Sequence, residues 1–129
     1  MSLESFTAAY IEAALWSSTD ESRDDGGDPL DANYGASDIA PECRAKMDAD
    51  CKAFYDAHSI TWRGQNLRVD IGLDDDCAGH DFWLNRNGYG AGFWDGDWAA
   101  PVASVLSAAA ERFGEFHLCV GDDGQIWEG

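Results

Sequence analysis

Three segments of the chain carry apolar residues three or four positions apart, which is the spacing of one face of an α-helix. These segments are residues 5–17, 38–58 and 99–113. Pro41 and Pro101 stand in the first turns of the second and third segments, where the missing amide of proline costs nothing. The pattern therefore predicts three amphipathic helices.

Two further stretches have the pattern of β-hairpins. In residues 80–98, two aromatic-rich runs lie on either side of Asn87-Gly88, a common hairpin turn. Residues 115–128 alternate apolar and polar side chains around a Gly-Asp-Asp-Gly turn. A short strand is also predicted at residues 67–71, with an irregular connection as the alternative. We expect one α+β domain over residues 1–129, with a small, mainly antiparallel sheet of two hairpins and about three helices packed on it.

Acidic residues greatly outnumber basic ones. The chain has 25 Asp and Glu against 8 Lys and Arg, a formal net charge of -17. This charge repels phosphate groups and argues against direct binding to nucleic acid or to an anionic membrane. No apolar run approaches the ~20 residues of a membrane span. The start of the chain lacks a secretory signal, so we expect a cytoplasmic protein whose four cysteines are free thiols.

Averaged over the surface, this charge is too dilute to imitate a nucleic acid. A protein of this mass exposes roughly 6,700 Å², or about one net charge per 400 Å², whereas B-DNA carries on the order of one per 100 Å². The carboxylates do gather, however, in a long acidic loop at residues 18–37 and again at residues 70–76. Long loops in small domains are usually functional. We therefore expect these clusters to contact a partner, with two tryptophans as aromatic anchors. The predicted contacts are Asp20, Glu21, Asp24, Asp25, Asp28, Asp31, Asp74, Asp75, Asp76, Trp94, Asp95, Asp97 and Trp98.

Two alternative interpretations remain open. Cys77 and His80 stand three residues apart, and His117 and Cys119 two apart, so the four could hold zinc or support hydrolysis if they converge. The sequence has no nucleophile elbow and no Cys-His signature, so we expect no enzyme activity and no cofactor. In the second alternative, the chain is a regulatory interaction module whose acidity reflects only the composition of its host.

Three runs of the sequence resemble a family of small acidic proteins carried by phages, prophages and plasmids. The runs are residues 14–22, residues 78–95, which read AGHDFWLNRNGYGAGFWD, and residues 120–126. The likeness covers most of the chain and is weakest over residues 60–73. The family has no assigned activity, cofactor or catalytic residue, so the resemblance implies only a context. Small accessory proteins of mobile elements often block host defences.

Charge and context together predict a non-enzymatic inhibitor. Lys and Arg side chains that hold phosphates can equally receive carboxylates. We therefore expect the protein to occupy a basic nucleic-acid-binding surface of a host defence system, in the manner of an anti-CRISPR or anti-restriction protein. The expected partner is a basic host protein, such as a nuclease or its guide complex.

Overall fold

The computed structural model describes residues 3–20, 27–63, 65, 74–88, 92–93 and 98–129. Four helices make up most of this part: α1 (Leu3–Ser17), α2 (Pro41–Trp62), α3 (Asp74–Arg86) and α4 (Ala100–Glu111). Two short 3-10 helices, η1 (Leu30–Ala32) and η2 (Ala36–Asp38), lie between α1 and α2. Strands β1 (Leu118–Val120) and β2 (Ile126–Glu128) form a two-stranded antiparallel sheet. The fold is mixed α+β, with a larger helical share than the sequence predicted.

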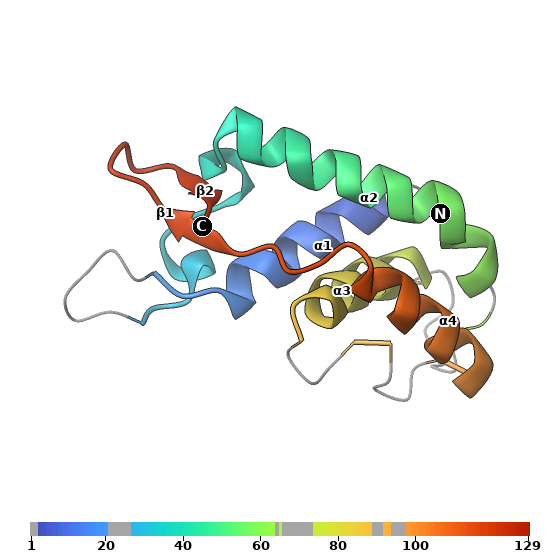
Figure 1. Cartoon of the computed structure of the whole chain (residues 1–129). Helices are drawn as coiled ribbons and strands as arrows, with labels where there is room; N and C mark the ends of the chain where they lie inside the picture. Colours follow the sequence, from blue (N-terminus) through green and yellow to red (C-terminus); the bar gives the residue numbers. More distant parts are fainter. Residues whose placement is uncertain (1–2, 21–26, 64, 66–73, 89–91, 94–97) are drawn as a thin grey trace.

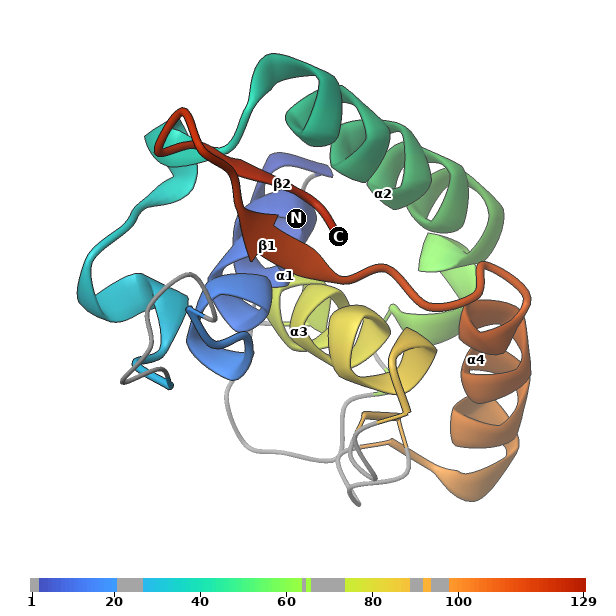
Figure 2. The same ribbon diagram turned by 60° about the vertical axis from the view of Figure 1, so that its left-hand side comes forward.

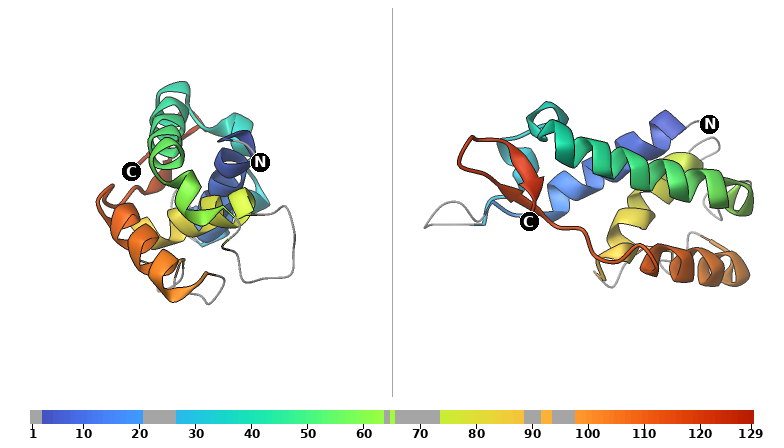
Figure 3. Two further views of the ribbon diagram at one scale, coloured as in Figure 1. Left: turned by 90° about the vertical axis from the view of Figure 1, so that its right-hand side faces the viewer. Right: turned by 45° about the horizontal axis from the view of Figure 1, so that its top comes forward.

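The four helices surround one apolar core. The end-on view in the left panel of Figure 3 shows α2 and α4 on one side and α1 on the other, with α3 crossing between α4 and α1. Phe54 of α2 lies near the middle, where its ring stacks on Phe82 of α3 at 4.1 Å and on Phe6 of α1 at 6.0 Å between centroids. Burying aromatic side chains supplies much of the hydrophobic stabilisation in a domain of this size.

Three of the four helices confirm the sequence prediction, because apolar periodicity is the strongest local signal. Helix α2 buries Cys43, Met47, Cys51 and Phe54 as one stripe, starts with Pro41 in its first turn, and runs four residues beyond the expected end at His58. The predicted second hairpin is also present. Its register pairs Cys119 with Trp127, and the glycine after the turn residues, Gly124, has a positive φ of 78°.

The hairpin predicted over residues 80–98 is wrong. The first arm lies in helix α3, which is buried on nearly all sides from Asp81 to Arg86. Asn87 and Gly88 follow the helix, and Gly88 adopts a φ of 68°, as glycine does where helices end. The Asn-Gly pair is therefore a helix stop and not a hairpin turn. The other predicted strand, residues 67–71, lies outside the described residues.

Helices α1 and α3 pack closely because one of the facing residues is a glycine. A Cβ atom on Gly79 would collide with the backbone carbonyl of Phe6. The absent side chain lets the two backbones approach, and this brings Trp83 against Tyr10, with ring centroids 5.3 Å apart. The side chains of α1 and α3 consequently share one surface as well as one core.

A buried guanidinium joins three helices and the C-terminal segment. Arg86, 4% exposed, donates to Asp50 at 2.9 Å, to the Tyr10 hydroxyl at 3.0 Å, and to the carbonyls of Gly114 and Phe113 at 2.8 and 3.0 Å. Burial raises the pKa of the Tyr10 hydroxyl far above its usual value, so this hydroxyl stays neutral. The charge of Arg86 is thus met by one carboxylate and three neutral oxygens.

Candidate protein interface

The structure removes three residues from the predicted contact surface. Asp20, Asp75 and Trp98 are all buried. Asp75 accepts a hydrogen bond from the Trp62 indole at 2.8 Å and a longer one from the Tyr55 hydroxyl at 3.4 Å. The Trp98 indole donates to Asp81 at 2.8 Å. Burial leaves these three side chains little surface for a partner, so they are not candidate contacts in the folded protein.

The other predicted contacts fall into two groups. Asp28 and Asp31 are exposed in the segment after α1, whereas Asp74 and Asp76 are half-buried in the first turn of α3. Figure 1 shows this first turn on the side of the molecule away from the hairpin. The described members of the two predicted clusters therefore do not lie on one surface. The remaining predicted contacts lie outside the described residues: Glu21, Asp24, Asp25, Trp94, Asp95 and Asp97.

A different acidic surface forms where the hairpin meets the segment before α2. The Ala40 amide donates to the Ile126 carbonyl at 2.8 Å, and Ile39 forms a parallel bridge with Ile126. Figures 1 and 2 show the hairpin and the loop between α1 and α2 together at one end of the molecule. We call this region the acidic end. Its acidic side chains are Asp28, Asp31, Asp38, Glu42, Asp122, Asp123 and Glu128.

The two segments of the acidic end, residues 27–43 and 118–129, contain no lysine, arginine or histidine. Six of the seven carboxylates are exposed, and Asp38 is partly buried, where it accepts a hydrogen bond from the Gly35 amide. Sequence inspection missed most of this surface because three of its seven carboxylates come from the C-terminal hairpin, 80 or more residues away from the others in the chain.

Asp123 shapes the turn of the hairpin. Its carboxylate accepts from the Gln125 amide at 3.0 Å and from the Trp127 indole at 3.1 Å. These hydrogen bonds hold the pKa of Asp123 below its ordinary value. The hairpin tip is therefore held in place by one of the carboxylates that it displays.

The exposed cations of α2 are matched by carboxylates of the same helix. Arg44 pairs with Asp48 at 2.9 Å, Lys46 with Asp50 at 3.3 Å, and Lys52 with Asp56 at 2.6 Å. Exposed pairs one helical turn apart contribute only a few tenths of a kcal/mol each. Their main effect is on charge: they leave this face of α2 close to neutral, whereas the acidic end has no such pairs within its own segments.

The four residues of the alternative zinc site do not form a metal site. Within the described part of the chain, which includes all four, no group of three or more His, Cys, Asp or Glu side chains could hold a metal ion.

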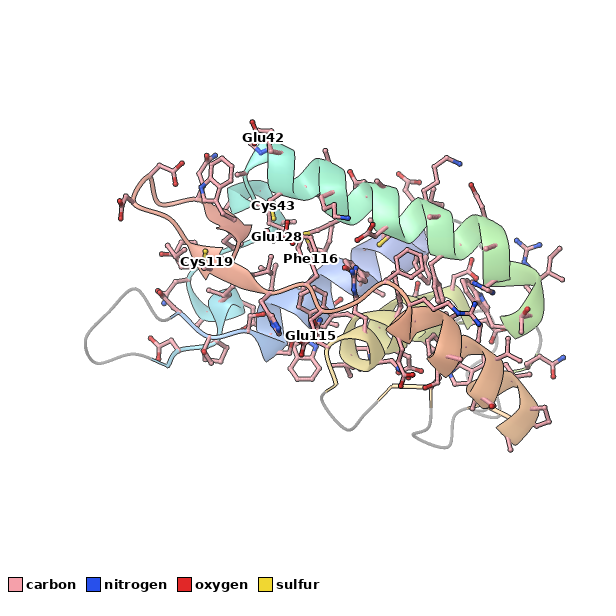
Figure 4. The ribbon with its side chains drawn as sticks, viewed as in Figure 1. Glu42, Cys43, Glu115, Phe116, Cys119 and Glu128 are labelled. Atoms are coloured by element: carbon pink, nitrogen blue, oxygen red, sulfur yellow. The ribbon has the colours of Figure 1, made fainter. Side chains whose placement is uncertain are left out.

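Cys119 of the hairpin lies near Glu128 and near Cys43 of α2 (Figure 4). Burial, with smaller effects of Glu128 and Cys119, raises the pKa of the Cys43 thiol to about 11. Cys43 is therefore a poor nucleophile and a poor metal ligand at neutral pH.

Comparisons of the chain with protein-family models, with curated proteins and with solved structures find no match. None of the helices in the described residues is both long and apolar enough to cross a membrane.

Proposed function

We propose that the protein is a non-enzymatic inhibitor that binds, through its acidic end, a basic nucleic-acid-binding surface of a host defence protein of the CRISPR or restriction type. The observation that carries the proposal is the acidic end itself. Seven carboxylates from two distant segments gather there, and those segments contain no cation. A surface whose charged groups are all negative attracts Lys and Arg side chains that otherwise bind phosphates.

The buried carboxylates support a binding role over a catalytic one. Asp50 pairs with Arg86, and Asp75 and Asp81 accept hydrogen bonds from indoles. Each of these contacts joins elements of the fold. The carboxylates that face solvent are those that a partner can reach, and they lie mostly outside the helical core.

The test compares two variants of equal net charge. One replaces Asp28, Asp31 and Glu128 of the acidic end with lysine. The control replaces the exposed residues Asp56, Glu111 and Glu115 with lysine. Each variant has a net charge of -11, since three reversals add six to -17. The measurement is DNA cleavage by a panel of restriction and CRISPR nucleases in the presence of each protein.

We expect the parent protein and the control to inhibit a nuclease of the panel. The acidic-end variant should need at least about tenfold more protein for the same inhibition of cleavage at low salt, because its association is slower. Equal losses in both variants would mean that only net charge matters. Absence of inhibition by the parent protein across the panel would contradict the proposed class of partner.

A further inference from the structure

Trp16 is the most exposed of the tryptophans that the structure describes, and Trp127 of the hairpin is partly buried. Trp16, in the last turn of α1, is 44% exposed. Trp62, Trp83 and Trp98 are buried, and their indoles donate to Asp75, Ser17 and Asp81. Exposed indoles are uncommon and are over-represented where proteins bind partners. The exposure of Trp16 therefore requires an explanation that packing does not give.

The Trp16 ring is held in place by a second ring. It stacks on His80 of α3, with centroids 5.7 Å apart and planes 28° from parallel. The His80 Nδ1 atom lies 3.4 Å from the buried carboxylate of Asp81, which limits the orientation of the imidazole. The indole is thus a pre-ordered surface, and ordering it on binding costs little conformational entropy.

Two carboxylates stand beside this ring pair. Glu12 precedes Trp16 by one turn of α1, and Asp76 precedes His80 by one turn of α3, so each lies on the same helix face as its ring. Glu12 and Asp76 line one open hollow of about 310 Å³ together with Ser5, Ala8 and Ala9. Among the described residues that line this hollow, none is a lysine or an arginine. The close packing of α1 on α3 at Gly79 brings these two helix faces together.

We propose that Trp16, His80, Glu12 and Asp76 form a docking site for an arginine side chain of the partner. The guanidinium plane stacks on the indole face that His80 leaves open, and its N–H groups point towards Glu12 and Asp76. Arginine fits better than lysine, because only a planar guanidinium can stack on a ring and still donate in its own plane. This inference rests on the proposed function, since it specifies how a basic partner is recognised away from the acidic end.

The pairing of rings with carboxylates suits a nucleic-acid-binding partner. Surfaces that bind single strands use arginine both to neutralise phosphates and to stack on bases. A stacked indole beside two carboxylates offers the same two kinds of contact. The site therefore adds an aromatic component to the electrostatic attraction of the acidic end.

The test uses hexa-arginine and hexa-lysine, two peptides of equal charge, in titration calorimetry at low salt. We expect the parent protein to bind hexa-arginine about 3- to 10-fold more tightly than hexa-lysine. Trp16→Ala should abolish this preference and leave the hexa-lysine affinity unchanged. Ile60→Ala, which truncates another exposed apolar side chain, is the matched control and should keep the preference.

A second variant tests the carboxylates without shortening their side chains. Glu12→Gln with Asp76→Asn should weaken hexa-arginine binding more than hexa-lysine binding. Equal affinity of the parent protein for the two peptides, no binding of hexa-arginine, or an arginine preference that survives Trp16→Ala would each overturn the site. The acidic-end variant should lower both affinities by a common factor. Failure of this site is therefore separable from failure of the proposed function, which nuclease inhibition tests on its own.

Discussion

The surroundings of Arg86 and the acidic end are both built from charged side chains, yet they differ in nearly every physical respect. The guanidinium of Arg86 is almost fully buried, and its donors go to a carboxylate, a hydroxyl and two carbonyls. The acidic end shows almost all of its carboxylates to water, without a cation in its own segments. The same residue types therefore hold the fold together in one place and remain available to a partner in the other.

The difference implies a division of energetic roles. Removing one member of a buried ion pair leaves a desolvated charge without compensation and costs several kcal/mol. Removing one exposed carboxylate changes little in the folded state, but it alters the field that an approaching protein meets. Stability and association should therefore respond to mutations in different regions of this molecule.

The largest effect is expected at Arg86. Arg86→Ala leaves the Asp50 carboxylate and the Tyr10 hydroxyl without their buried donor and removes a cation that lies 5.4 Å from the centre of the Phe82 ring. We expect a loss of about 3–5 kcal/mol in the free energy of unfolding, measured by urea denaturation. Arg112→Ala, at an exposed arginine, should change it by less than about 0.5 kcal/mol. Similar losses in the two variants would refute the contrast between buried and exposed charge.

A smaller loss is expected at Asp75, which the sequence placed on the surface. Asp75→Ala leaves the buried Trp62 indole without an acceptor, and an unsatisfied buried donor costs about 1–3 kcal/mol. Asp75→Asn keeps an acceptor and should lose less, as urea denaturation would show. An Asp75→Ala protein as stable as the parent would return Asp75 to the candidate contacts.

Asp75, predicted as a surface contact but found buried, shows why the sequence predicted the helices but not most of the acidic end. Apolar periodicity is local, so it located α1, α2 and α4 from their own residues. In α3, Ala78 and Phe82 also stand four residues apart. The aromatic pair Phe82-Trp83 and the following Asn87-Gly88, however, indicate a hairpin when they are considered without the preceding residues. Whether a carboxylate faces water depends on distant residues such as Trp62, which local sequence does not specify.

The acidic end and Trp16 were missed for the same reason. The pairing of Ile39 with Ile126 places the hairpin beside the segment that precedes α2. A local sequence pattern does not predict a contact between residues so far apart in the chain. Trp16 directly follows the apolar residues of α1 in the sequence. It stands one helical turn after Glu12, however, so it lies on the exposed face of the helix and outside the core. Counting charges along the sequence located two of the seven carboxylates of the acidic end, Asp28 and Asp31, because they lie close together in the sequence.

The acidic end should tolerate charge reversal without unfolding. In the variant with lysine at Asp28, Asp31 and Glu128, we expect a free energy of unfolding within about 0.5 kcal/mol of the parent value. Relief of repulsion between like charges offsets the small local losses. Urea denaturation at low and high salt measures this, and the stability difference should shrink as salt screens the remaining charge. A loss comparable to that of Arg86→Ala would mean that these carboxylates are structural too.

Asp123 combines features of the two regions: it is exposed like the rest of the acidic end, and its carboxylate is hydrogen-bonded like the partners of Arg86. Its folded pKa is depressed by the Gln125 amide and the Trp127 indole, so its ionised form stabilises the turn above the ordinary carboxyl pKa of 3.8. That stabilisation is lost as the pH falls through the lower, folded value. In a proton NMR titration of the parent protein, we expect the Trp127 indole signal to shift with a midpoint below 3.8. Asp123→Asn keeps an acceptor without a titrating charge, so its indole signal should stay constant over this range. A parent midpoint at or above 3.8, or the same shift in the variant, would show that Asp123 displays its charge without fixing the hairpin.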